Sequence, residues 1–187
     1  MQLTGKKIMI LATNGFEQAE LEVPRDRLKA AGATVEIVSP EKGEITGWKT
    51  NDWGSPVKVD RALDGVKADD YDAIVLPGGQ INPDLLRVND KALKLILAFY
   101  KQKKVVAAVC HAPWLLIETG MIKGRKATSY KSIKTDMINA GALWEDSTVV
   151  TDQGIITSRN PGDLEAFSKK IIEEVSEGLH TQRSAAA

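Results

Sequence analysis

The sequence is short of the residues that disulfides and zinc sites require. Among its 187 residues there are one cysteine, Cys110, and two histidines. One cysteine cannot form an internal disulfide, and a structural zinc site needs several Cys or His ligands. We therefore expect a cytoplasmic protein, kept in a reducing compartment, that holds no metal ion.

Long apolar runs are also missing. A helix that spans a bilayer needs about 18–20 consecutive apolar residues, and no run in the chain comes near that length. The run at residues 8–12 follows Lys6 and Lys7 but ends at Thr13, short of the ~7–15 residues of a signal-peptide core. We expect neither a membrane protein nor an exported one.

The chain has no excess of charge of either sign. Its 25 basic and 25 acidic residues balance, so it lacks the electrostatic footprint of a protein that binds nucleic acid or anionic lipid. Two small basic clusters, at residues 101–104 and 123–126, are expected to be solvated loops.

The composition that remains is that of an ordinary globular domain. Hydrophobic residues make up 43% of the chain and charged residues 27%, and a chain of this length fits one core. We expect a single domain over residues 1–178 and a flexible C-terminal tail over residues 179–187.

Short buried apolar runs alternate with amphipathic segments along the chain. The predicted strands are residues 7–12, 34–38, 73–76, 105–109, 149–151 and 155–158. The predicted helices are residues 23–31, 91–102, 111–119, 133–140 and a last one capped by Asn160. This order predicts an α/β fold with a mostly parallel sheet and helices on both faces.

An irregular stretch interrupts this alternation between residues 41 and 70. Its scattered glycines and short apolar pieces predict a small hairpin excursion followed by a long loop. The stretch carries Trp48 and Trp53. These tryptophans form either the lid of a small core or a subunit interface.

Cys110 follows the predicted strand 105–109 directly. In open parallel sheets ligands bind at the carboxyl ends of the strands, and Ala108 and Ala112 flank the cysteine with the spacing of a hydrolase nucleophile elbow. A thiol that faces the N-terminus of the next helix has a lowered pKa, which predicts a reactive thiolate. The alternative is an inert buried cysteine at the end of a core strand.

Gly78 and Gly79 follow the neighbouring strand 73–76. Their amides can approach a ligand closely, as an oxyanion hole requires, although most glycine pairs simply make turns.

Acidic and histidine side chains are candidates for the rest of the site. Glu17 and Glu20 share one face if their segment is helical, and a buried carboxyl beside a thiol would have a raised pKa and donate a hydrogen bond to it. They could equally be exposed acids at a helix start. His111 adjoins Cys110, but consecutive side chains at a helix start diverge by about 100°. If His111 is a base, Asp84 is a candidate for orienting it, including from another subunit.

Several motifs together carry a family resemblance. They are residues 15–24 (GFEQAELEVP), 75–79 (VLPGG), 108–113 (AVCHAP), 124–130 (GRKATSY), 137–142 (MINAGA) and 157–164 (TSRNPGDL). With these the sequence resembles the PfpI-like family of intracellular proteases and protein deglycases. That family belongs to the class I glutamine amidotransferase-like superfamily, which also holds the Parkinson-disease protein deglycase.

The resemblance implies a flavodoxin-like three-layer sandwich and assigns roles to residues. Cys110 would be the nucleophile, Glu20 the carboxyl paired with it, and His111 its neighbour, with Gly79 and His111 amides shaping the oxyanion pocket and Glu17 secondary. A third acidic residue, for which Asp84 is the candidate, would come from a neighbouring subunit of a homo-oligomer.

The resemblance also implies a function without a cofactor. The expected activity is that of a cysteine-dependent hydrolase or deglycase that acts on glycated amines, glycated peptides or 2-oxoaldehydes (a glyoxalase-type reaction), with peptidase activity and a stress-response role as further attributions. The alternative is a non-enzymatic redox-sensing or chaperone-like stress protein that uses oxidation of Cys110.

Overall fold

The computed structural model describes residues 2–183. Within them the main sheet has seven strands in the order β10-β11-β7-β6-β1-β2-β5. These strands are β1 (Lys7–Leu11), β2 (Thr34–Ser39), β5 (Arg61–Ala62), β6 (Ala73–Leu76), β7 (Val105–Val109), β10 (Val149–Asp152) and β11 (Ile155–Ser158). Neighbours pair in parallel except β10 and β11, which are antiparallel. The predicted mostly parallel α/β fold is confirmed.

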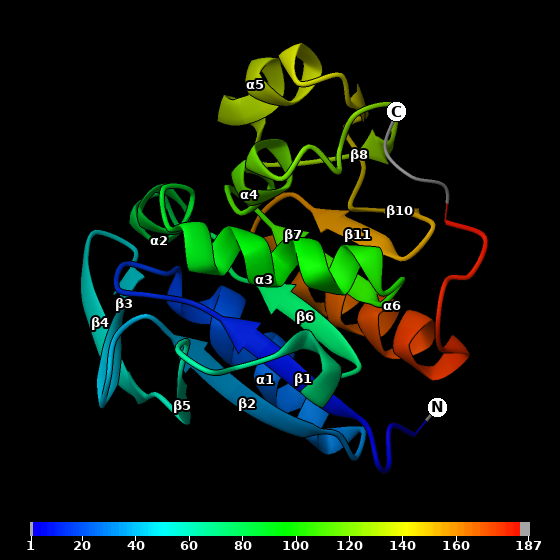
Figure 1. The fold of residues 1–187 in the computed structure, drawn as a ribbon. Helices are drawn as coiled ribbons and strands as arrows, with labels where there is room; N and C mark the ends of the chain where they lie inside the picture. Colours follow the sequence, from blue (N-terminus) through cyan, green and yellow to red (C-terminus); the bar gives the residue numbers. More distant parts are fainter. Residues whose placement is uncertain (1, 184–187) are drawn as a thin grey trace.

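Helices cover both faces of this sheet, which makes a three-layer sandwich (Figure 1). One face is covered by α1 (Gln18–Ala30) and α6 (Leu164–Glu177). The other is covered by α2 (Ile81–Leu86), α3 (Asp90–Lys101), α4 (Pro113–Glu118) and α5 (Lys134–Asn139). Because successive side chains of a strand alternate between faces, Ile8 packs in the α1–α6 core and Met9 in the opposite one.

The central strands β6 and β7 are buried along their whole length. Their sequences, AIVL and VVAAV, are continuous apolar runs, as expected for parallel strands covered on both faces. Leu76 pairs with Ala108, so the two strands end side by side. The segments that follow them, from Pro77 and from Cys110, therefore meet at one edge of the sheet.

The predicted hairpin excursion is present as β3 (Glu44–Lys49) and β4 (Asp52–Lys58), which pair with each other outside the main sheet (Figure 1). Ile45 and Val57 extend the core on the α1 face. Trp48 is half-buried, and Trp53 is 53% exposed. The two tryptophans therefore do not form the lid of a core. A short parallel pair, β8 (Lys126–Ala127) and β9 (Leu143–Trp144), lies beyond α4.

The sequence predicts a flexible tail from residue 179, and within the described residues this segment is exposed at Leu179, Thr181 and Gln182 but buried at Arg183. The Arg183 side chain is 4% exposed, and its guanidinium donates to the backbone carbonyls of Tyr100, Lys104 and Gln153. These hydrogen bonds anchor the described part of the segment at Arg183, and the division into a domain over residues 1–178 and a flexible tail over residues 179–187 stays a prediction. Residues 184–187, the rest of the predicted tail, lie outside the described residues.

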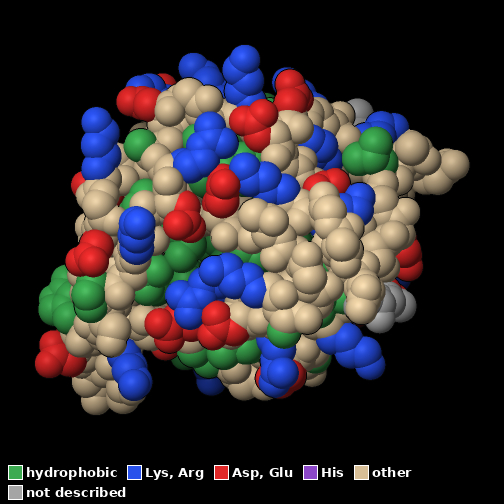
Figure 2. Space-filling view, turned by 90° about the horizontal axis from the view of Figure 1, so that it is seen from below, with side chains coloured by type: hydrophobic (Ala, Val, Ile, Leu, Met, Phe, Trp, Pro, Cys, Tyr) green, Lys and Arg blue, Asp and Glu red, His purple; other side chains and the backbone are tan. Residues whose placement is uncertain are grey.

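The surface shown in Figure 2 carries basic and acidic side chains intermingled, as the balanced composition predicts. Among the described residues no helix combines the length and the apolar character needed to cross a bilayer.

Candidate active site

Cys110 occupies a sharp turn between β7 and α4. Its φ is +64°, a conformation that non-glycine residues adopt rarely and that tends to mark functional sites. The backbone is held on both sides, because the Cys110 N–H donates to the Ser158 carbonyl at 3.0 Å and the Tyr130 N–H donates to the Cys110 carbonyl at 2.8 Å. The side chain is 6% exposed.

The predicted lowering of the Cys110 pKa is not what the structure indicates. Helix α4 begins only at Pro113 and has six residues, so Cys110 is not at the start of the helix predicted over residues 111–119. Burial raises the pKa of the Cys110 thiol, and a charged Glu20 raises it further, while the amides of Gly79 and His111 oppose the rise. Burial therefore favours the protonated form of Cys110.

His111 contacts Cys110 directly. The Cys110 Sγ lies 3.1 Å from Nδ1 of His111, and Nε2 of His111 lies 3.1 Å from Oγ of Ser132. The imidazole stacks on the Tyr130 ring, with 4.8 Å between ring centroids. Burial lowers the pKa of His111, so the ring is neutral near pH 7. If Nε2 donates its proton to Ser132, Nδ1 is free to accept the thiol proton.

Glu20 brings a buried carboxyl to the same thiol. Helix α1 begins at Gln18, five residues before the predicted start at residue 23, which places Glu20 in its first turn with no exposed surface. Its Oε2 accepts a hydrogen bond from the Gly78 amide at 2.8 Å. Its Oε1 is buried without a fixed partner among the described residues, although the carboxyl and the Cys110 thiol interact. Burial raises the pKa of Glu20 to about 8, so this carboxyl is mostly protonated at neutral pH.

The two glycines have different roles from the shared one that the sequence predicted. The Gly78 amide is used to hold Glu20. The Gly79 amide faces the Cys110 sulfur, as does the amide of His111. Gly79 and His111, rather than Gly78, are therefore the candidate donors for an oxyanion.

A cleft opens over these residues. Its volume is about 490 Å³, and its lining includes Glu17 together with Cys110, His111 and Glu20. Desolvation raises the pKa of Glu17. Further walls come from Trp48, Tyr130 and Pro161. The volume suits a small molecule or a single amino-acid side chain.

Asp84 does not join this group within one chain. It is exposed on α2 and does not line the cleft, and Ser132 occupies the position next to Nε2 of His111. The role of Asp84 across a subunit interface stays a prediction. Sequence reasoning missed Ser132, for which no motif gave a signal, and Tyr130, which closes the motif at residues 124–130.

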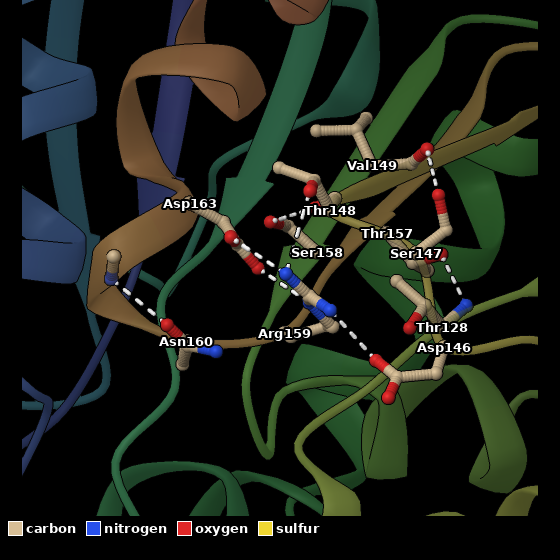
Figure 3. A network of polar contacts seen from close by, with 11 residues as sticks. Thr128, Asp146, Ser147, Thr148, Val149, Thr157, Ser158, Arg159, Asn160 and Asp163 are labelled. Carbon is tan, nitrogen blue, oxygen red and sulfur yellow. Dashed lines mark hydrogen bonds and ion pairs between the residues drawn. The ribbon is translucent and has the colours of Figure 1, made fainter.

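A polar network braces the loop after β11, which carries Pro161 (Figure 3). The Arg159 guanidinium binds both carboxylate oxygens of Asp163, at 2.8 and 3.1 Å, and Oδ1 of Asp146 at 2.7 Å. Ser158, whose carbonyl holds the Cys110 amide, donates its hydroxyl to the Thr148 carbonyl. The network thus fixes both the backbone beside the nucleophile and one wall of the cleft.

One group of acidic side chains in the described part of the chain is close enough to share a metal ion. It consists of Glu173, Glu174 and Glu177. None of them lines the cleft, and Glu173 pairs with Lys170 at 2.7 Å.

The fold and the site together define an α/β sandwich protein with a cysteine at the turn after a central strand. The chain belongs to the DJ-1/PfpI family, which matches residues 6–174. It is 46% identical over 167 residues to the Deglycase PfpI of Pyrococcus furiosus, across 89% of this chain and 98% of that protein. It is 44% identical over 166 residues to the Putative cysteine protease YraA of Bacillus subtilis, across 88% of this chain and 95% of that one.

Solved structures agree with this membership. Drosophila melanogaster DJ-1beta has a TM-score of 0.82 and 30% identity, with 95% of both chains covered. A two-domain protein of Anabaena variabilis, with DJ-1/ThiJ/PfpI-like and ferritin-like domains, has a TM-score of 0.86 and 35% identity, with 91% of this chain covered. The chain spans half the length of that two-domain protein.

Proposed function

We propose that this protein is a cysteine-dependent hydrolase that acts on glycated amines and on 2-oxoaldehydes. The observation that carries the proposal is the 3.1 Å contact between the Cys110 thiol and Nδ1 of His111 inside the cleft. The name Deglycase PfpI, carried by a relative with 46% identity, supports it. We further propose that the protein works in the cytoplasm and as a homo-oligomer.

The first chemical step is addition of the thiol to a carbonyl carbon, or substitution of the thiol for the amine at the carbinol carbon of an adduct. The neutral imidazole of His111 takes the Cys110 proton at Nδ1 while the sulfur forms its bond to carbon, which is general base catalysis of nucleophilic attack. The negative charge that develops on oxygen can be bound by the amides of Gly79 and His111. No preformed thiolate is needed, which agrees with the raised pKa of Cys110.

Glu20 supports this step as long as it is protonated. The protonated carboxyl can donate a hydrogen bond to the sulfur, and because it is neutral it does not repel the negative charge that forms there. With a pKa of about 8, Glu20 fulfils this condition at neutral pH.

The later steps follow from the first with no change in overall oxidation state. When the substrate is the carbinolamine of methylglyoxal, the C–N bond breaks as the C–S bond forms, and the amine leaves with the proton that His111 took from the thiol. The hemithioacetal that remains on Cys110 is the same species that free methylglyoxal would give. A proton shift between its two oxygen-bearing carbons yields a lactoyl thioester, and water then releases lactate and restores the thiol.

Hydrolysis of a peptide bond would use the same nucleophile and base, with an acyl-enzyme intermediate. The name of the relative YraA, a putative cysteine protease, supports this as a further activity.

The test is release of unmodified Nα-acetylarginine amide from its methylglyoxal adduct, in which the aldehyde is bound to guanidino nitrogen, after the adduct has been purified from unreacted aldehyde. An excess of a scavenging amine traps aldehyde that dissociates spontaneously. The measured quantity is the increase in release rate over a control that contains the scavenger but no enzyme. We expect the wild type to accelerate release and Cys110→Ala, checked for folding by circular dichroism, to lose that acceleration. Equal rates for the two proteins would refute the proposed mechanism.

A further inference from the structure

The hairpin β3–β4 supplies one wall of the cleft that contains Cys110. Trp48, which is half-buried, and Thr50 both line the cavity. The Trp53 ring packs edge-on against Trp48, with ring centroids 5.6 Å apart and an interplanar angle of 77°. The Trp48 indole is therefore held in place by a second indole while it contributes to the surface of the cleft.

Backbone hydrogen bonds fix this hairpin to the segment that leads into α1. The Trp48 N–H donates to the Phe16 carbonyl at 2.6 Å, and the Gly15 N–H donates to the Thr46 carbonyl at 2.8 Å. The same segment carries the carboxyl groups of the site. The hairpin is therefore a fixed wall of the cleft.

A side chain of α1 adds to this attachment. Gln18 Oε1 accepts a hydrogen bond from the Ser55 amide at 3.1 Å. A Cβ atom at Gly47 or at Gly54 would lie 2.4 or 2.3 Å from the same oxygen. Only glycine at these two positions allows the hairpin backbone to approach the Gln18 side chain so closely. The hairpin sequence is therefore suited to packing against α1.

Glu17 lies beside Trp48 on this wall. The two residues form a parallel β-bridge, and bridged strands are about 4.8 Å apart. Both side chains line the cleft. No basic side chain among the described residues contributes to the pKa of Glu17, which desolvation raises and a hydrogen bond from the Ala19 amide lowers.

The charge of the cleft is set by Glu17. Among the described residues that line it there is no lysine or arginine. Glu20, the other acid, is mostly neutral at pH 7 because its pKa is about 8. The cleft therefore favours cationic ligands over anionic ones.

We propose that Trp48 and Glu17 form a subsite that binds a planar cation of the guanidinium class. The preferred substrates are therefore those in which an arginine-type side chain carries the group that reacts at Cys110. An indole is the best ring for a cation–π contact, and guanidinium uses it more often than ammonium does. The edge of the same planar cation can donate two hydrogen bonds to one carboxylate. The biological use of this specificity rests on the proposed function. Its test does not, because the test measures binding alone.

The test measures binding without chemistry. Cys110→Ala protein is titrated at pH 7 with four amides: Nα-acetylarginine amide, the neutral citrulline analogue of the same shape, the lysine analogue and the glutamate analogue. Affinity is followed by indole fluorescence and by saturation-transfer NMR. We expect arginine to bind roughly five- to thirty-fold tighter than citrulline, with lysine between them and glutamate weakest. Equal affinity for arginine and citrulline, or tighter binding of glutamate, would overturn the proposal.

Variants then assign the preference to the two side chains. Glu17→Gln and Trp48→Leu in the Cys110→Ala background should each reduce the ratio of arginine to citrulline affinity at least about threefold, while Trp48→Phe should keep most of it. Glu44→Gln removes an exposed charge from the same hairpin outside the cleft and should leave the ratio unchanged. A ratio unchanged by Glu17→Gln and Trp48→Leu, in proteins with wild-type melting temperatures, contradicts the subsite.

The outcomes for subsite and activity are separable. An arginine preference in Cys110→Ala protein supports the subsite even if the wild type fails to release amines. Release of amines by the wild type without that preference supports the proposed function and rejects the subsite.

Discussion

The Cys110 sulfur and Nδ1 of His111, on consecutive residues, lie 3.1 Å apart. Consecutive side chains of a helix diverge by about 100° and would not meet in this way. The φ of +64° at Cys110 takes that residue out of the helical path and brings the two side chains together. Burial raises the pKa of the thiol and lowers that of the imidazole, so it favours the neutral form of both groups.

Removal of the base should affect turnover more than binding. We expect His111→Ala to lower kcat for amine release by about 10²- to 10⁴-fold with little change in KM, because the imidazole acts on the thiol proton. Steady-state kinetics on the purified adduct measure both constants.

Ser132 provides the matched comparison for this variant. Ser132→Ala should lower kcat by a smaller factor, about tenfold, because Ser132 only fixes the tautomer of His111, and Ser132→Thr should recover most of the loss. A His111→Ala protein within twofold of the wild-type kcat would contradict the role of the base.

The pH dependence of kcat/KM should be bell-shaped, with an upper limb set by Glu20. Below about pH 8 Glu20 is protonated and neutral. As the pH rises through that value, the carboxyl ionises, and its charge opposes the negative charge that forms on Cys110. Activity should therefore fall above about pH 8.

Glu20→Gln separates this effect from others. Glutamine keeps the size and the acceptor for the Gly78 amide but cannot ionise, so the variant should lose the upper limb and retain the lower one, which reports His111. The measurement is kcat/KM from pH 5 to 10 for the wild type and for Glu20→Gln. An identical decline of kcat/KM at high pH in both proteins would exclude Glu20 as the cause of the decline.

A methyl group at residue 78 should disrupt the site from within. A Cβ atom there would lie 2.6 Å from Oε2 of Glu20 and 2.7 Å from both Cys110 Cβ and the Val109 carbonyl oxygen. We expect Gly78→Ala to lose activity and to lower the free energy of unfolding by about 2–3 kcal/mol, as measured by urea denaturation.

A second glycine controls for backbone effects in that experiment. Gly65 has a φ of +81°, and a Cβ atom added there would meet nothing within 4 Å beyond its chain neighbours. Gly65→Ala should therefore destabilise by about 1 kcal/mol through backbone strain alone and keep full activity. If the two variants behaved alike, crowding at Gly78 would not be the cause.

The layout of the sheet and the location of the site could be predicted because both depend on local patterns. The apolar runs at residues 73–76 and 105–109 became β6 and β7 with the predicted bounds, and topology then brings the residues after them to one edge. The upward shift of the Cys110 pKa could not be predicted this way, because it depends on burial by residues far apart in the sequence.

The partners of the site residues show the same limit. Gly78 and Glu20 are 58 positions apart, and His111 and Ser132 are 21 apart. No spacing rule connects such residues, and the left-handed backbone at Cys110 that joins it to His111 is unusual for a non-glycine residue.

Arg183 makes stabilising contacts within the segment that the sequence predicts to be a flexible tail. It therefore offers a test of stability away from the site. Its Nε donates to the Gln153 carbonyl at 2.7 Å, and its two terminal nitrogens donate to Tyr100 and Lys104 carbonyls at 3.1 and 2.9 Å. Burial lowers the pKa of Arg183 to about 10, which leaves it charged at neutral pH. Arg183→Met keeps most of the apolar stem but leaves three carbonyls without this donor, which should lower the free energy of unfolding by about 2–4 kcal/mol. Urea denaturation of this variant beside Gln182→Ala, at an exposed neighbour, measures the effect, and equal midpoints for the two would show that the C-terminal segment does not contribute to stability.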